Sequence, residues 1–257
     1  MASATAGRDV GATAVRVVDA VGVGSGSALP SGSALRSLLD LCTGSACLGC
    51  GVPGVVWCDR CLSGVVEVHG RTAPSGLAVL AGARYEGQVR QAVVAHKERG
   101  QLSLVRPLAR LLVAAMGRPS GALLVPVPSR RAAVRARGQD HARRLAGRAA
   151  ALCQGSVTPA LSWARSALDQ AGLGVNGRSR NVDRAMRARR SPPGGVVWLV
   201  DDVMTSGATI DEAARALVAA GWWVAGVAVV ASVDARTEQP RVRGPIGPRR
   251  VSPPPIA

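Results

Sequence analysis

The sequence predicts an α/β protein with a mostly parallel sheet that is covered by helices on both faces. Between about residues 77 and 233, short apolar runs alternate with longer amphipathic segments, the pattern of strand–helix repeats. The short runs are rich in Val and do not alternate with polar residues, as expected for strands buried on both faces. With 47% apolar residues but no Phe and one Tyr, the core must consist mainly of Val, Leu and Ala.

The predicted elements follow one another along this region. A short amphipathic turn at 35–41 precedes them. Strands are expected at residues 77–85, 122–128, 195–202 and 222–232. Helices are expected at residues 87–100, 102–116, 139–153 and 207–221. Prolines stop the second strand, and Gly221 ends the last helix.

Four segments are expected in the chain as a whole. Residues 1–34 read as a disordered leader, or as the product of a start codon placed too far upstream. Residues 35–70 form a cysteine module, 75–233 the α/β domain, and 234–257 a disordered tail rich in Pro and Arg. No segment reaches the length of a membrane span, and no signal-peptide pattern is present. A cytoplasmic location is therefore expected, with cysteines present as thiols or metal ligands.

Two C-x-x-C pairs separated by seven residues predict a closed zinc site. Its expected ligands are Cys47, Cys50, Cys58 and Cys61. Four thiolates fill a tetrahedral shell, so the ion would be structural. The alternative is a set of free or redox-active cysteines. Cys42 has the wrong spacing to be a ligand, Cys153 is expected to be a buried thiol, and His69 is expected in a loop beside the module.

The stretch from Trp198 to Ile210 combines two features that suit a sugar phosphate. Asp201 and Asp202 end an apolar strand, at the sheet edge where open α/β folds bind ligands. Carboxylates accept hydrogen bonds from vicinal hydroxyls and can hold Mg²⁺. The small residues that follow lie at a helix N-terminus, which suits a phosphate: Thr205, Ser206, Gly207, Ala208 and Thr209. A helix cap would explain one residue only, and too little chain follows for a response-regulator receiver.

The motifs resemble those of the ComF family of predicted amidophosphoribosyltransferases, within the type I phosphoribosyltransferase superfamily. The carrying stretches are "CLGC…CDRC", "YEGQVRQAVVAHKERGQ", "LLVPVPSRRAAVRARGQDHARRLA", "DQAGLGVNGRSRNV" and "VVWLVDDVMTSGATI". They cover roughly residues 35–232 in the family's order. One departure is "RGQDH" in place of R-G-F-N-Q, which puts roles at residues 139–141 in doubt. A second is Ser206 in place of the second Thr of T-T-G, which keeps the hydroxyl.

The resemblance implies a type I phosphoribosyltransferase fold that binds phosphoribosyl pyrophosphate (PRPP) with Mg²⁺. Asp201 and Asp202 would bind the ribose hydroxyls, and residues 205–209 the 5-phosphate. Pyrophosphate would lie near Arg130 or Arg131, with Lys97 as a further candidate catalytic residue. Lys97, the only lysine in the chain, could equally be a solvated helix end. A nitrogen nucleophile would displace pyrophosphate, and the loop 174–181 could close over the substrate. The sequence does not indicate which molecule is the nitrogen acceptor. It also leaves the oligomeric state open, with a homo-oligomer as one possibility.

The net charge of +16 is compatible with a second hypothesis, in which the protein is not an enzyme but a nucleic-acid-binding or accessory protein. It comes from 32 Lys and Arg against 16 Asp and Glu, which permits contact with single-stranded DNA. The alternative is a compositional bias toward Arg, since aromatic residues are not interleaved with the arginines as a stacking surface requires. The second hypothesis is a non-catalytic protein, or an accessory protein of DNA uptake or competence, that binds single-stranded DNA or uses the PRPP site for regulation.

Overall fold

The computed structural model describes residues 45–130, 134–135, 138, 140–164, 184–233 and 246–247. The predictions for the leader, for the turn at 35–41, for Cys42 and Arg131, and for the loop 174–181 lie outside the described residues. Within the expected tail, Ile246 forms an isolated antiparallel bridge with Val224. Among the described residues, no helix is both long and apolar enough to cross a bilayer.

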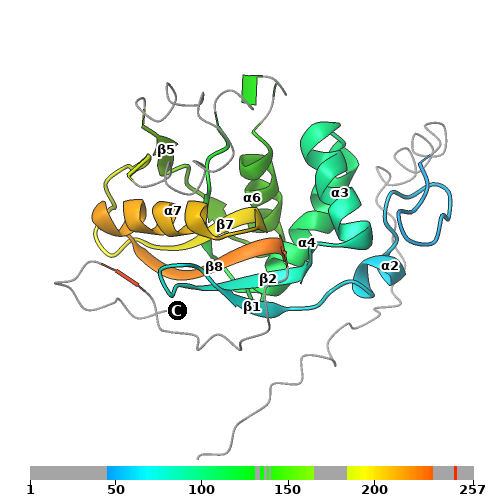
Figure 1. The fold of residues 1–257 in the computed structure, drawn as a ribbon, viewed down its shortest axis with the longest axis horizontal. Coiled ribbons are helices and arrows are strands. Elements are labelled where there is room, and N and C mark those ends of the chain that lie inside the picture. The colour runs from blue at the N-terminus through cyan, green and yellow to red at the C-terminus, as the bar shows by residue number, and fades with distance from the viewer. Residues whose placement is uncertain are drawn as a thin grey trace, which may run out of the picture.

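Six strands of the described chain form one twisted sheet, in the order β1-β2-β8-β7-β3-β4 (Figure 1). Its strands are β1 (His69–Thr72), β2 (Ala78–Arg84), β3 (Leu123–Pro126), β4 (Ser156–Val157), β7 (Val196–Met204) and β8 (Trp223–Ser232). Only β1 runs antiparallel to its neighbour, and the other four pairings are parallel. The predicted mostly parallel α/β sheet is therefore confirmed, with β7 and β8 at its centre.

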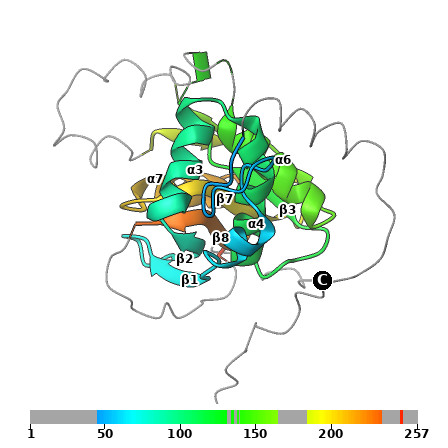
Figure 2. The ribbon, with the colours of Figure 1, turned by 90° about the vertical axis from the view of Figure 1, so that its right-hand side faces the viewer.

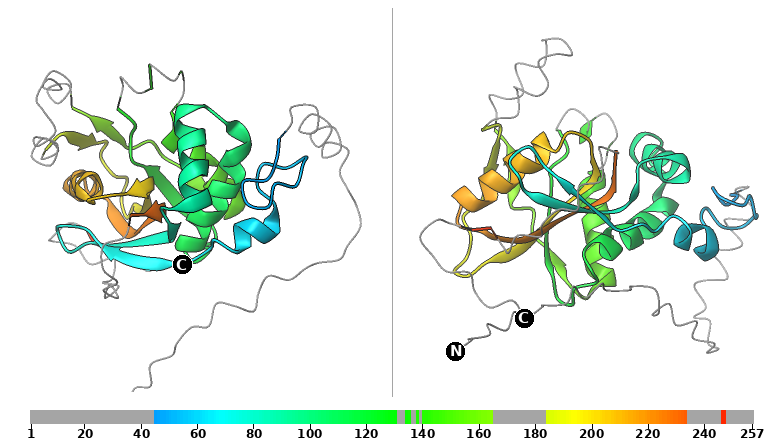
Figure 3. Two further views of the ribbon diagram at one scale, coloured as in Figure 1. Left: turned by 45° about the vertical axis from the view of Figure 1, so that its right-hand side comes forward. Right: turned by 60° about the horizontal axis from the view of Figure 1, so that its bottom comes forward.

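Helices cover both faces of the sheet, as the two-sided burial of the strands requires. The helices α3 (Gly87–Glu98), α4 (Val105–Ala115) and α6 (His141–Leu152) lie on one face, with the 3₁₀ turn η1 (Leu102–Leu104) leading into α4. The helix α7 (Ala208–Ala219) lies on the other, beside a two-stranded ribbon of β5 (Leu161–Trp163) and β6 (Met186–Ala188). Figure 3 shows the two layers on opposite sides of the sheet.

Alternate residues of the central strands contribute to two separate cores. On β7, Val197 and Leu199 join the α7 core, whereas Val200 joins the core under α4 and α6. Both cores consist mainly of Val, Leu and Ala, as the composition predicted. On β2, a Cβ at Gly82 would lie 2.1 Å from the carbonyl oxygen of Leu111, so α4 packs directly onto the backbone of this strand.

The cysteine module packs against the helical layer formed by α3 and α4 (Figure 2). It comprises a loop and the short helix α2 (Asp59–Ser63). Trp57 and Leu62 are buried in the same core as the residues of α3 and α4, and Asp59 pairs with Arg110 of α4. The module is therefore joined to the sheet domain by apolar contact as well as by the chain.

The predicted elements between residues 77 and 233 are present, with differences of detail. The helix expected at 102–116 begins as the 3₁₀ turn, and the helix expected at 139–153 begins at His141. The prediction that β7 ends at the acidic pair is wrong, because the strand continues to Met204. His69, expected in a loop, is the first residue of β1. The β5–β6 ribbon was not predicted, since strands of three residues carry no periodicity.

Candidate functional site

The candidate site lies at the carboxyl edge of the parallel strands. Because β2, β8, β7 and β3 run in the same direction, the segments that follow them meet at one edge. Asp201 and Asp202 lie near the end of β7, where Asp201 is half-buried and Asp202 is 8% exposed. They are brought next to Lys97 of α3, which is far from them in sequence. This is the place where ligands bind in open α/β sheets.

Lys97 and Asp202 form an ion pair at this edge. The Nζ of Lys97 lies 2.7 Å from Oδ2 of Asp202, and the two side chains are 36% and 11% exposed, respectively. Burial alone would lower the pKa of Lys97, but Asp202 and, more weakly, Asp201 and Tyr85 raise it above its usual value. The alternative of a solvated helix end is wrong, because the ammonium group is bound to the carboxylate of Asp202.

Asp201 differs from its neighbour in its protonation. Burial, followed by the adjacent negative charge of Asp202, raises the pKa of Asp201 from 3.8 to about 8. Its Oδ1 accepts a hydrogen bond from the backbone N–H of Asp202 at 2.8 Å, and Oδ1 of Asp202 accepts from that of Val203 at 2.6 Å. At neutral pH the pair therefore combines a carboxylate that is paired with a cation and a carboxyl group that can also donate a hydrogen bond.

The segment between β7 and α7 forms a tight turn at the start of the helix. Thr205 and Ser206 are exposed and Gly207 is buried. Gly207 has φ = 81°, and a Cβ there would lie 2.8 Å from Cε of Met204 and 3.1 Å from Cβ of Ala73. Glycine is thus required both by the left-handed backbone and by the close approach of Ala73, in the turn that follows β1. The N–H groups of the first turn of α7 carry the positive end of the helix dipole, which suits a bound anion.

The turn between β1 and β2 braces this helix start. Asp211, in the first turn of α7, accepts hydrogen bonds from the backbone N–H of Ser75 at 2.9 Å and from the hydroxyl of the same residue. The contact joins two segments that are 136 residues apart. The start of α7 is therefore held by the β1–β2 turn as well as by its connection to β7.

The segment after β3 extends toward the β5–β6 ribbon. Arg130 is exposed, and its guanidinium carbon lies 4.8 Å from the ring centroid of Trp163, a cation–π contact. The indole N–H of Trp163 donates to the carbonyl of Pro128 at 2.8 Å. Asp140 caps α6 by accepting from the N–H of Arg143, which gives this residue a structural role. The structure thus places Arg130 against the β5–β6 ribbon, and Arg131, the alternative candidate for binding pyrophosphate, lies outside the described residues.

Each of the three histidines has a neighbour that the sequence did not indicate. The Nε2 of His69 lies 2.7 Å from Oγ of Ser232, and its Nδ1 lies 2.9 Å from the carbonyl oxygen of Glu67. His96 and His141 are buried and make an edge-to-face contact, with ring centroids 4.9 Å apart. Burial lowers the pKa of His96. His69 therefore lies in the sheet and is not part of the four-cysteine cluster.

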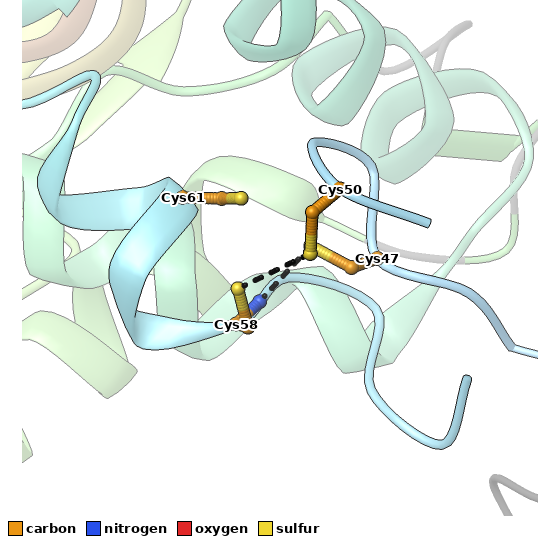
Figure 4. Close-up of side chains that lie close together, drawn as sticks. All are labelled: Cys47, Cys50, Cys58 and Cys61. Carbon is orange, nitrogen blue, oxygen red and sulfur yellow. Dashed lines mark hydrogen bonds between the residues drawn. The ribbon is translucent and has the colours of Figure 1, made fainter. Parts of the chain in front are cut away.

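The four predicted metal ligands come together in one cluster. Their sulfur atoms all lie within 4.8 Å of one another, and those of Cys50 and Cys58 are 3.8 Å apart. A tetrahedral zinc ion with Zn–S bonds of about 2.3 Å requires S···S separations of about 3.8 Å. Figure 4 shows the sulfurs turned toward one another, two from the loop and two from the start of α2. The cluster can therefore hold a structural metal ion such as zinc.

The surroundings of Cys47 favour a thiolate, whereas those of Cys61 favour a thiol. Burial would raise the pKa of Cys47, but N–H groups of Cys58, Cys50 and Gly49 donate to its sulfur and lower the pKa to about 6. Hydrogen bonding with the thiol of Cys58, and then burial, raise the pKa of Cys61 to about 12. Amide hydrogens directed at a ligand sulfur are typical of the surroundings of structural metal sites. Cys153, in contrast, is buried at the end of α6 as predicted, away from the cluster.

In the comparisons with known proteins, the chain matches no protein-family model and no curated protein. The resemblance to the ComF family therefore stays a prediction from the motifs.

Proposed function

We propose that the chain binds PRPP together with Mg²⁺ and transfers its phosphoribosyl group to a nitrogen nucleophile. The observation that carries the proposal is the sequence of features along one segment at the carboxyl edge of the sheet. The adjacent acids Asp201 and Asp202 lie near the end of a central parallel strand, which continues to Met204, and the left-handed turn at Gly207 opens α7 two residues after Thr205. A ribose 5-phosphate presents a diol, which suits the two acids, and a phosphate, which suits the turn at the start of α7.

The two acids would hold the ribose. Carboxylate oxygens accept hydrogen bonds from the 2- and 3-hydroxyls, and a pair of acids can accept from both at once. Lys97 fixes the side chain of Asp202 by its ion pair, so this acceptor is oriented before the ligand binds. The raised pKa of Asp201 means that binding to its ionised form would release a proton near neutral pH.

The turn and the start of α7 would hold the 5-phosphate. The hydroxyl groups of Thr205, Ser206 and Thr209 can donate to phosphate oxygens, as can the N–H groups of the first helical turn. Gly207 allows the left-handed turn that opens α7, because a Cβ there would meet Met204 and Ala73. The carboxylate of Asp211, near the proposed phosphate site, is already paired: it accepts two hydrogen bonds from Ser75 in the β1–β2 turn.

The reaction itself needs positioning and charge more than a covalent nucleophile. The bond between C1 of the ribose and pyrophosphate breaks as a bond from C1 to nitrogen forms, and the nucleophile loses a proton. The transition state resembles an oxocarbenium ion, as in glycoside hydrolysis. Lys97 has three donors, of which one contacts Asp202, so the others can neutralise the leaving group. Arg130 would contribute only after leaving the ring of Trp163.

The donor set fits a Mg²⁺ ion that is shared with the ligand. Mg²⁺ usually binds through one or two carboxylates, substrate phosphates and several waters, instead of an all-protein cage. Here two carboxylates are present and one of them is already paired with Lys97, which favours a shared ion. Bound there, Mg²⁺ would neutralise charge on the leaving pyrophosphate. The zinc cluster has no open position, so its expected role is to stabilise the module that packs on α3 and α4.

Calorimetric titration with PRPP and Mg²⁺ tests the proposal. The wild-type protein should bind, and the Asp201→Asn/Asp202→Asn variant should lose binding at least about tenfold, because neither side chain can then provide a carboxylate acceptor. Asp59→Asn is the matched control, since Asp59 is an exposed acid on α2 that pairs with Arg110. No binding by the wild type would overturn the proposal. Equal binding by the double variant would overturn the assignment of the site.

A further inference from the structure

A groove on the α7 face of the sheet is lined by arginines and is separate from the acidic pair. It has a volume of about 820 Å³ and lies between β6 and the second half of α7. Of the described residues that line it, four are arginines, and none carries a carboxylate or an aromatic ring. The four are Arg184, Arg187, Arg190 and Arg215, and all are exposed.

The floor of the groove consists of small residues. Ala216, Ala219 and Gly221 line it from α7 and from the turn that follows. Small side chains let an extended chain approach the helix closely while the arginines reach it from the sides. The carbonyl end of α7 carries about half a negative charge, which the surrounding guanidinium groups exceed.

Hydrogen bonds at one end fix the groove in shape. Glu212 of α7 is 4% exposed, and its carboxylate accepts from the N–H of Met186 at 2.8 Å and from the guanidinium of Arg215 at 2.8 Å. Arg215 also donates to the carbonyl of Met186 at 3.2 Å. Its side chain is nevertheless 42% exposed, so an oriented guanidinium group still faces the groove.

Further hydrogen bonds hold the other end of the groove. The N–H of Ser191 donates to the carbonyl of Ala220 at 2.9 Å, and the indole N–H of Trp222 donates to the carbonyl of Arg189 at 2.8 Å. The segment 186–191 is therefore held at two places, to α7 at Met186 and to the turn after α7 at Arg189 and Ser191. A ligand would meet a preformed surface, which lowers the entropy cost of binding.

We propose that this groove binds a chain of phosphates, either a free polyphosphate or the backbone of a single-stranded nucleic acid. Guanidinium groups match phosphate oxygens in geometry and charge. The absence of aromatic rings among the described lining residues removes base stacking, so recognition would be independent of base sequence. The proposal does not depend on the PRPP site, whose residues lie at the carboxyl edge of the sheet.

Fluorescence anisotropy with a labelled 15-nucleotide thymidine strand, and calorimetry with tripolyphosphate, test the proposal on the full chain. The variant is Arg187→Gln/Arg190→Gln, which leaves the Glu212–Arg215 frame intact. The control is Arg106→Gln/Arg118→Gln, which removes the same charge from exposed positions on and after α4. Binding by the groove variant should weaken about tenfold at low salt, at up to about fivefold for each exposed ion pair. For the nucleic acid, the slope of log affinity against log salt should fall by about 1.4.

The outcomes separate the two sources from each other and from a general charge effect. Binding of tripolyphosphate alone assigns the groove to free polyphosphate, and binding of the strand alone assigns it to nucleic acid; either supports the proposal. Equal losses in the groove and control variants would overturn it, as would equal affinity for poly-glutamate of matched charge. It would also fail if the groove variant melted at a lower temperature with unchanged affinity, because the arginines would then serve only the end of α7.

Discussion

Replacing Lys97 by methionine removes the ammonium group from the acidic pair and keeps a side chain of similar length. Asp202 then remains as an 11% exposed carboxylate without its cation. Removing one partner of a fully buried pair costs about 3–5 kcal/mol, whereas an exposed pair contributes about 0–1 kcal/mol. Since Lys97 is 36% exposed, solvent screens part of the loss. We expect a cost of about 2 kcal/mol, or a fall in melting temperature of about 4–8 °C.

Urea unfolding followed by circular dichroism, at pH 7, measures this cost. A double-mutant cycle with Asp202→Asn isolates the pair from other effects of each substitution. Asp202→Asn should cost less than Lys97→Met, because a lysine that is a third exposed can find water. The double variant should cost about 1 kcal/mol less than the sum of the single variants. High salt should change little, because the pair is partly shielded from solvent.

The pH dependence has a definite sign. The pKa of Lys97 is raised in the folded protein, so its contribution is complete below the unfolded pKa of 10.5. The contribution disappears as pH rises through the raised value. Arg90→Met, an exposed position on the same helix, is the control and should change stability by less than about 0.5 kcal/mol. A Lys97→Met variant that matches this control, or a cycle with additive effects, would refute the inference that the pair orders the site.

Three further predictions concern the acids, the turn and the cysteines. Asp201 binds a proton in the folded state up to about pH 8, and the stabilisation that this proton provides declines as pH rises from about 4 toward 8. Asp201→Asn should therefore raise the free energy of unfolding above pH 8 and leave it nearly unchanged at pH 4. A loss of stability that is constant across pH would contradict this. Gly207→Ala should lower the melting temperature more than Gly76→Ala, because both glycines have positive φ but only a Cβ at Gly207 would meet other atoms within 4 Å. The strained backbone alone costs about 1 kcal/mol in each variant, so equal shifts by calorimetry would show that the contacts with Met204 and Ala73 are unimportant. Cys58→Ser should lose bound zinc, measured by mass spectrometry, and melt earlier, while Cys153→Ser retains the metal; equal zinc content in both variants would exclude the cluster as the binding site.

Local patterns in the sequence predicted much of the fold and one half of the candidate site. Apolar strands and amphipathic helices between residues 77 and 233 are set by short-range periodicity, so their order could be read directly. The two C-x-x-C pairs gave the ligand cluster, because two residues between cysteines suffice to turn the chain. The acidic pair and the turn that follows it lie within nine residues of each other, at 201–209, and required no long-range contact.

Contacts between distant segments could not be predicted in this way. His69 and Ser232 are 163 residues apart, and they meet only because β1 adds to β2 and β2 pairs with β8. The edge-to-face pair of His96 and His141 depends on how α3 and α6 pack. The three-residue strand β6 is too short to show a periodic pattern, so the arginine groove beside it could not be predicted from the sequence.

By itself, the sequence determined which chemical groups this protein has at each turn: two acids before a glycine turn, and four thiols in two close pairs. These are local features, because neighbouring residues constrain each other through the backbone. The tertiary structure alone decided which distant group faces them. Lys97 lies against Asp202, Arg130 lies over the ring of Trp163, and four arginines line one groove beside α7. The physical reason is that such neighbours depend on the order of the strands and on the packing of the helices, which involve the whole chain.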